Sequence, residues 1–145
     1  MTNESSASSA ASATADSETF RGLALAVSLT VKDLAKSIAW YHDVVGFPIQ
    51  ERHEREGKLI AVALTAGTGR ILIGQDNGAK GWDRIKGEGF SLQVTTEQSV
   101  DAVAKRIQER GGRLESEPAD MPWGARVFRV MDPDGYRITI SSPRP

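Results

Sequence analysis

Alternating large and small side chains mark the first predicted strand of the chain. Within Leu23–Val31, large apolar residues stand at every second position from Val27 onward, and the residues between them are small or polar. This period-two pattern is typical of a strand with one apolar face towards a core and one lean face of small side chains. The lean face of this strand consists of Ala26, Ser28 and Thr30.

A helix is predicted over Leu34–Val45. Asp33 precedes it in the position of an N-cap, and Gly46 follows it in the position of a left-handed C-cap. Apolar residues recur at spacings of three and four, which places them on one side of the helix. This apolar stripe consists of Leu34, Ile38, Tyr41 and Val45.

Three short strands are predicted after the helix. They are Phe47–Arg52, Lys58–Leu64 and Arg70–Gln75, and the last two are joined by a turn that contains glycine. A longer loop, Asp76–Glu88, then carries Trp82 and Arg84. Loops of this length are often functional or connect two halves of a protein.

The same order of elements then recurs. A strand and a helix are predicted over Gly89–Thr95 and Ser99–Arg110, and the helix ends at Gly111 and Gly112. AVSLTV at 26–31 matches GFSLQV at 89–94, and TAGTGRILI at 65–73 matches DPDGYRITI at 132–140. An internal repeat of this kind points to two copies of one βαβββ unit. The last three predicted strands are Arg113–Glu117, Ala125–Val130 and Tyr136–Ser141.

We therefore predict an α+β domain over residues 20–145, made of repeats 22–76 and 88–143. The helix of each repeat would cover one face of its sheet. The two lean faces, which carry the small side chains, would meet and enclose a cleft. The alternation predicts which residues line this cleft. They are Ala26, Ser28, Thr30, Leu72, Gly89, Ser91, Gln93 and Thr139.

Residues 1–19 differ in composition from the rest of the chain. They are mainly Ser, Ala and Thr, with no aromatic residue and no large aliphatic residue beyond Met1. Such a segment cannot bury enough surface to offset its chain entropy, so we expect a disordered tail. It has neither the basic start nor the apolar centre of a secretory signal, which makes the cytoplasm the expected compartment.

Composition excludes several classes of function. The chain has no cysteine, so disulfides, thiolate metal sites and cysteine nucleophiles are absent. Its net charge of −1 offers no electrostatic attraction to nucleic acid, and no apolar run approaches the ~18 residues of a membrane span. The two histidines, His42 and His53, are expected at the surface. We expect neither nucleic acid nor membrane as a partner.

Two stretches carry a resemblance to a known family. They are LTVKDLAKSIAWYHDVVGFPI at 29–49 and MPWGARVFRVMDPDGYRITI at 121–140. With the repeat between them, residues 22–143 resemble the vicinal oxygen chelate superfamily, which includes glyoxalase I, extradiol dioxygenases and bleomycin resistance proteins. The second stretch is most similar to the bleomycin resistance branch. The resemblance implies the glyoxalase/bleomycin resistance fold and a homodimer.

Enzymes of this superfamily hold a divalent metal through His, Gln or Glu on the first and last strands of each repeat. In this chain the resemblance assigns those positions to Ala26, Leu72, Gly89 and Thr139. Three of these side chains cannot coordinate a metal, and a lone threonine hydroxyl is a poor ligand for Zn or Fe. A shift of register could bring in Gln75 or Gln93 but would not complete a ligand set. We expect no metal site and no cofactor.

The function favoured by the resemblance is metal-independent binding or sequestration of a small organic molecule. One alternative is a metal-dependent lyase or oxidoreductase, and a second is a structural or regulatory dimer without a ligand. Trp123 and Trp82 could stack on a flat ligand, and Arg126 could bind a carboxylate or phosphate or instead pair with Asp132 or Asp134. The predicted ligand-binding residues are Ser28, Leu72, Trp82, Gln93, Trp123, Arg126 and Thr139.

Overall fold

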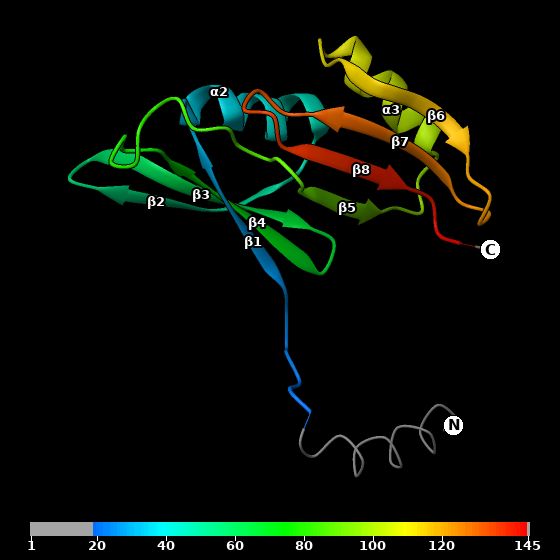
Figure 1. The fold of residues 1–145 in the computed structure, drawn as a ribbon, viewed down its shortest axis with the longest axis horizontal. Coiled ribbons are helices and arrows are strands. Elements are labelled where there is room, and N and C mark those ends of the chain that lie inside the picture. The colour runs from blue at the N-terminus through cyan, green and yellow to red at the C-terminus, as the bar shows by residue number, and fades with distance from the viewer. Residues whose placement is uncertain (1–18, 145) are drawn as a thin grey trace.

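The structure, a computed structural model, describes residues 19–144. Two four-stranded sheets have the strand orders β1-β4-β3-β2 and β5-β8-β7-β6 (Figure 1). In each sheet the first and last strands along the chain are parallel, and the other neighbours are antiparallel. The strands of the first sheet are β1 (Ala26–Val31), β2 (Ile49–Arg55), β3 (Lys58–Ala66) and β4 (Gly69–Gln75). Those of the second are β5 (Ser91–Thr95), β6 (Leu114–Asp120), β7 (Arg126–Met131) and β8 (Arg137–Ser141).

The predicted α+β fold of two βαβββ modules is confirmed. Most strands begin or end within three residues of the predicted bounds. The first strand is shorter than predicted, because β1 begins at Ala26 and the residues before it lead away from the sheets as an extended arm (Figure 1). The predicted tail, residues 1–19, lies outside the described residues except for Thr19.

The first helical segment differs from the expected continuous α-helix. It consists of α2 (Leu34–Ile38) followed by a π-helix, η2 (Ala39–Val45). The carbonyl of Tyr41 accepts hydrogen bonds from the amides of Gly46 (3.1 Å) and Phe47 (3.0 Å), which widens the last turn. The apolar stripe is buried or half-buried in both parts, so hydrophobic spacing alone did not distinguish them.

Side chains cap the helices as the sequence predicts. Asp33 Oδ1 accepts from the amide of Lys36 at the start of α2, and Gly46 ends η2 in the left-handed region with φ 107°. The helix of the second module, α3 (Val100–Glu109), begins after Ser99, whose hydroxyl accepts from the amide of Ala102.

A single apolar core joins the two modules. The helices lie on the same side of the two sheets (Figure 1), and the sheet faces beneath them supply most of the buried side chains. On β1, Leu29 and Val31 are buried while Ala26 and Ser28 are exposed, as the alternation predicts. The largest fully buried side chains are Tyr41, Phe128, Leu64, Ile71, Ile73, Ile107 and Ile138.

The register of the second sheet differs by two residues from the sequence match. Ser28 pairs with Leu72 in the first sheet, whereas Thr139, the predicted counterpart of Leu72, pairs with Gln93. Counted from Thr139 with the spacing of the first sheet, the position equivalent to Ala26 is Ser91, whereas the sequence match gives Gly89, which lies before β5 begins. A shift of two residues keeps every side chain on its predicted face, which is why the alternation did not detect it.

Candidate functional site

A cleft of about 410 Å³ lies where the two modules meet. Its walls come from the arm before β1, the start of β1, the β3–β4 hairpin and most of β5. β1 and β5 are the edge strands of their sheets, so the cleft lies at the boundary between the sheets. The large apolar side chains that line it are Leu23, Leu25, Val27, Ile71, Leu92 and Val94.

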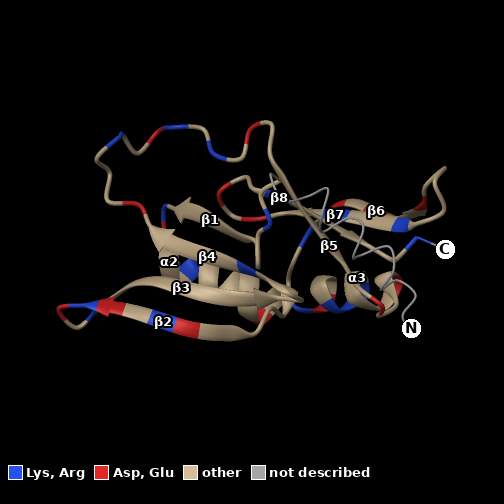
Figure 2. Cartoon of the chain, turned by 90° about the horizontal axis from the view of Figure 1, so that it is seen from below, with Lys and Arg blue, Asp and Glu red and all other residues tan. Residues whose placement is uncertain are grey.

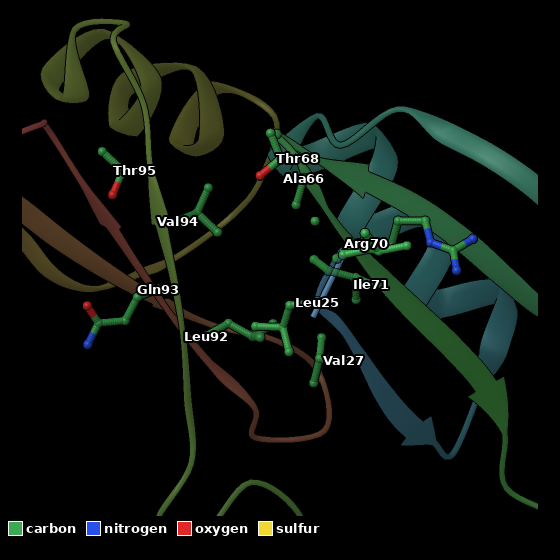
Figure 3. Close-up of a pocket in the computed structure, with 14 residues that line it drawn as sticks. Leu25, Val27, Ala66, Thr68, Arg70, Ile71, Leu92, Gln93, Val94 and Thr95 are labelled. Carbon is green, nitrogen blue, oxygen red and sulfur yellow. The ribbon is translucent and has the colours of Figure 1, made fainter. Parts of the chain in front are cut away.

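The side chains of β5 divide between the two sides of the strand (Figure 3). Leu92 and Val94 project towards the first module, and Leu92 meets Leu25 and Val27 across the cleft. Gln93 and Thr95 point to the other side of the strand, and Arg70 points away from the cleft (Figure 3). The interior surface of the cleft is therefore mainly apolar.

A second cavity of about 510 Å³ adjoins the first and shares three lining residues with it: Gly67, Val94 and Thr95. It extends from the end of β5 to the exit of η2 and to one face of α3. Its lining includes two arginines, Arg106 and Arg110.

Four of the seven predicted ligand residues lie on the open faces of the sheets. Ser28 pairs with Leu72 on the first sheet, and Gln93 pairs with Thr139 on the second. Ser28 and Gln93 are exposed, Leu72 is half-buried and Thr139 is buried. Of these four, Gln93 lines the cleft, and the other three line neither of the two cavities. Their role in binding stays a prediction.

The two predicted tryptophans lie on loops outside both cavities, and each is about half exposed. Trp82 lies against Gly78 so closely that a Cβ at Gly78 would overlap its ring. Asp76 anchors the loop that carries it, accepting from the amide of Gly78 (2.8 Å) and from Lys86 Nζ (3.1 Å). These bonds hold the pKa of Asp76 below its ordinary value. The loop is thus tied to the end of β4.

Two carboxylates engage Arg126. Figure 2 marks the acidic and basic residues along the chain by colour. Its guanidinium donates to both oxygens of Asp101 (2.7 and 3.0 Å) and to Asp120 Oδ1 (3.1 Å). The bonds to Arg126 hold the pKa of Asp101 below its ordinary value. The alternative prediction that Arg126 pairs with aspartates is confirmed, but the predicted partners, Asp132 and Asp134, are wrong. The predicted partners belong to the turn after β7, whereas the observed partners lie on α3 and β6.

A buried hydrogen bond ties the modules together. The Tyr41 hydroxyl on η2 donates to Asp132 Oδ2 (2.8 Å) in the β7–β8 turn, and Asp132 Oδ1 accepts from the amides of Asp134 and Tyr136 (both 2.8 Å). Burial raises the pKa of Asp132 and that of Tyr41. In the same region the Tyr136 hydroxyl donates to the carbonyl of Thr30 (3.0 Å).

Sequence reasoning missed this bond between the modules. Both partners belonged to recognised motifs, Tyr41 to the helical stripe and Asp132 to the Asp-Pro-Asp-Gly turn, but nothing in the sequence paired them. The available signal was a hydroxyl within an otherwise apolar stripe, because a buried hydroxyl needs a partner.

The positions that correspond to metal ligands do not form a donor set. They are Ala26, Leu72, Thr139 and either Gly89, by the sequence match, or Ser91, by the strand pairing; the hydroxyls of Ser91 and Thr139 bond to each other at 3.1 Å. Gln75, one of the two possible replacements, is occupied otherwise: its Oε1 accepts from the amide of Leu34 and its Nε2 donates to the carbonyl of Lys32. These residues do not fit Zn²⁺ or Fe²⁺, which prefer imidazole, carboxylate or thiolate ligands.

Clustered metal ligands and long apolar helices are both missing from residues 19–144. Within this range no three or more His, Cys, Asp or Glu side chains gather as a possible metal site. None of the helices in the same range has both the length and the apolar character needed to cross a membrane.

Solved structures share this fold. TioX from Micromonospora sp. ML1 matches with a TM-score of 0.68 and 22% identity, over 83% of this chain and 98% of that chain. TnmS3 from Streptomyces sp. CB03234, described as an antibiotic binding protein, matches with a TM-score of 0.66 and 24% identity, over 85% of this chain and 97% of that one. At these identities the likeness shows the fold alone.

Sequence comparison defines the family. The uncharacterized protein YraH from Bacillus subtilis (strain 168) is 31% identical over 127 residues, covering 80% of this chain and 94% of YraH. A probable lactoylglutathione lyase from Synechocystis sp. is 27% identical over 119 residues, covering 77% of this chain and 88% of that protein. Residues 24–140 match the family described as Glyoxalase/Bleomycin resistance protein/Dioxygenase superfamily. The chain belongs to this superfamily.

Proposed function

We propose that this chain reversibly binds a small organic molecule in the cleft between its modules, without a metal. The observation that carries the proposal is the apolar cleft of about 410 Å³ bounded by Leu25, Val27, Ile71, Leu92 and Val94. Sites for small molecules are concave and mostly apolar, with volumes of roughly 300–1,000 Å³. The antibiotic binding protein TnmS3, which shares the fold, supports binding of this kind.

Apolar burial supplies the affinity in this proposal. Each Å² of apolar surface removed from water contributes about 25 cal/mol, and a ligand between Leu92 and Val27 would cover apolar side chains of both modules. Gln93 is the predicted ligand residue that borders the cleft, but its side chain points to the other side of β5, so the proposed affinity does not depend on its amide. Binding of this type needs no acid, base or metal.

The lactoylglutathione lyases among the relatives favour a metal-dependent enzyme as the competing function. Such an enzyme needs metal ligands on the open faces of the sheets. Ala26, Leu72, Ser91 and Thr139 do not supply them. We therefore place metal-independent binding ahead of lyase or oxidoreductase chemistry.

A fluorescence titration with the neutral apolar probe N-phenyl-1-naphthylamine tests the proposal. We expect saturable binding to the full chain with the same Kd before and after treatment with EDTA. Leu25→Arg, at an exposed position that lines the cleft, is expected to weaken binding at least about tenfold, because it places a charge in the apolar site. Leu92→Arg, on the opposite wall, is the second variant.

Ile85→Arg is the matched control for this titration. Ile85 is also an exposed aliphatic residue, but it lies on the loop outside the cleft, so its replacement should leave the Kd unchanged. Binding that disappears with EDTA, or that is equal in all three variants, would contradict metal-independent binding in the cleft.

We also propose a homodimer. The arm before β1 exposes Phe20, Leu23 and Leu25 almost completely, and clustered apolar side chains of this size usually mark an interaction surface. A second copy of the chain is the proposed partner, as the family resemblance implies. We expect light scattering to give twice the chain mass, and Phe20→Ser/Leu23→Ser to shift the protein towards monomer. A wild-type mass of one chain across the concentration range would overturn this proposal.

A further inference from the structure

Two arginines without an acidic partner among residues 19–144 line the second cavity. Arg106 and Arg110 stand four residues apart on α3 and at its C-cap, so their side chains project from the same face of the helix. Among residues 19–144, no Asp or Glu lies within ion-pair distance of either guanidinium, and no acidic residue lines this cavity. Arg126 and Arg137, in contrast, each bond to a carboxylate at 2.7 Å.

The surroundings of this pair are suited to an anion. Thr95 and Thr96 line the cavity beside the arginines, and the hydroxyl of Thr96 accepts from the amide of Gln98 (3.1 Å), so its proton stays free for donation. Gly46 also lines the cavity and lies beside Arg110, since a Cβ at this position would be 3.6 Å from Arg110 Nη1.

Two like charges on one turn have a small energetic cost. A pair of cations four residues apart slightly destabilises a helix, and the helix dipole near the C-terminus partly offsets this effect. An oxyanion between the two guanidiniums would remove the repulsion and accept charge-assisted hydrogen bonds. The planar guanidinium matches carboxylate and phosphate oxygens in pairs.

The position of the arginines relative to the cleft decides what they would bind. The two cavities share Gly67, Val94 and Thr95, so a molecule seated against Leu92 and Val94 extends directly towards the arginine pair. We propose that the ligand is an amphipathic organic anion, with its apolar body in the cleft and a carboxylate or phosphate group held by Arg106 and Arg110. This inference rests on the proposed binding function and adds the chemical class of the ligand.

A matched pair of fluorescent probes tests the inference: 11-(dansylamino)undecanoic acid and its methyl ester. Both present the same apolar body, but only the acid is charged. We expect the full-length protein to bind the acid at least about tenfold more tightly than the ester. Arg106→Gln/Arg110→Gln should reduce the affinity for the acid to that for the ester and leave the ester unchanged.

Arg52→Gln/Arg55→Gln is the control, because it removes the same charge from exposed positions on β2. It should leave both affinities unaltered. Arg106→Lys/Arg110→Lys should retain part of the preference for the acid, since charge is kept while the paired hydrogen bonds are lost. If the double variant does not fold, the single variant Arg110→Gln, which changes an exposed residue, replaces it in the titration.

The outcomes separate this inference from the proposed function. Equal binding of acid and ester, with no effect of the arginine variants, overturns the anion site and leaves apolar binding in the cleft supported. If neither probe binds, the proposed function fails for this ligand class, and a titration with inorganic sulfate followed by NMR decides the anion site alone. Shifts of the Thr96, Arg106 and Arg110 amides support the site, and their absence overturns it.

Discussion

Replacement of Asp132 with alanine is expected to lower the free energy of unfolding by about 2–4 kcal/mol, since a buried donor left without a partner costs about 1–3 kcal/mol. The change removes the acceptor of the Tyr41 hydroxyl, which is fully buried, and of two turn amides. It also removes the hydrogen bond between η2 of the first module and the β7–β8 turn of the second. Urea unfolding monitored by circular dichroism measures the effect.

Asp132→Asn is the matched control for the alanine variant. Its amide oxygen can still accept from the turn amides of Asp134 and Tyr136, and its NH₂ group can donate to Tyr41 Oη. We expect Asp132→Asn to stay within about 1 kcal/mol of the wild type at neutral pH. A loss as large as that of the alanine variant would show that the charge, and not the hydrogen bonds, holds the turn.

The difference in stability between the wild type and Asp132→Asn is expected to depend on pH. Burial raises the pKa of Asp132, so the folded state favours the protonated carboxyl more than the unfolded state does. The stabilising contribution of this proton is complete below the ordinary pKa of about 3.9 and is lost as the pH rises through the raised pKa of the folded state. As the pH rises above about 4, the wild type should therefore lose stability relative to Asp132→Asn. An opposite slope would contradict the raised pKa.

Gly87→Ala is expected to destabilise the protein by about 2–5 kcal/mol. Gly87 has φ +78°, a conformation that costs a residue with a side chain about 1–2 kcal/mol, and forced overlap adds about 1–3 kcal/mol. A Cβ at this position would lie 2.5 Å from the carbonyl oxygen of Gly135 and 2.9 Å from Tyr136 Cα. Both atoms are backbone atoms of the β7–β8 turn, so neither can move aside easily.

Gly89→Ala controls for backbone conformation. Gly89 has φ +70°, but no atom lies within 4 Å of the position that a Cβ would take, so only the conformational cost of about 1–2 kcal/mol applies. Chemical denaturation of the two variants measures the difference directly. Equal losses would show that the loop between β4 and β5 does not press against the turn of the second module.

Local sequence patterns predicted the elements of the fold with good accuracy. Strand alternation placed Leu29 and Val31 in the core, and the capping residues Asp33 and Ser99 marked the helix starts. Both signals act over a few residues, and the sequence displays them directly. The sequence did not reveal the π-helix after Ile38 or the two-residue difference in strand register around Ser91. Neither feature changes which face of its element is apolar.

The candidate site was less predictable than the fold. The faces with small side chains were expected to enclose a cleft, but the cleft lies at the boundary between the sheets and is lined by Leu25, Val27, Leu92 and Val94. The pairs formed by Arg126 with Asp101 and Asp120 join separate elements of the second module. Such contacts depend on how modules and strands pack against one another, and short-range patterns contain no information on this.

By itself, therefore, the sequence determined the two-module α+β fold and the family resemblance. These depend on residue type and spacing along the chain. The tertiary structure alone decided the apolar cleft between β1 and β5, the Tyr41–Asp132 hydrogen bond and the place of the arginine pair beside the cleft. Each of these brings together residues from both modules, and only the packing of the modules around their common core sets the distances between them.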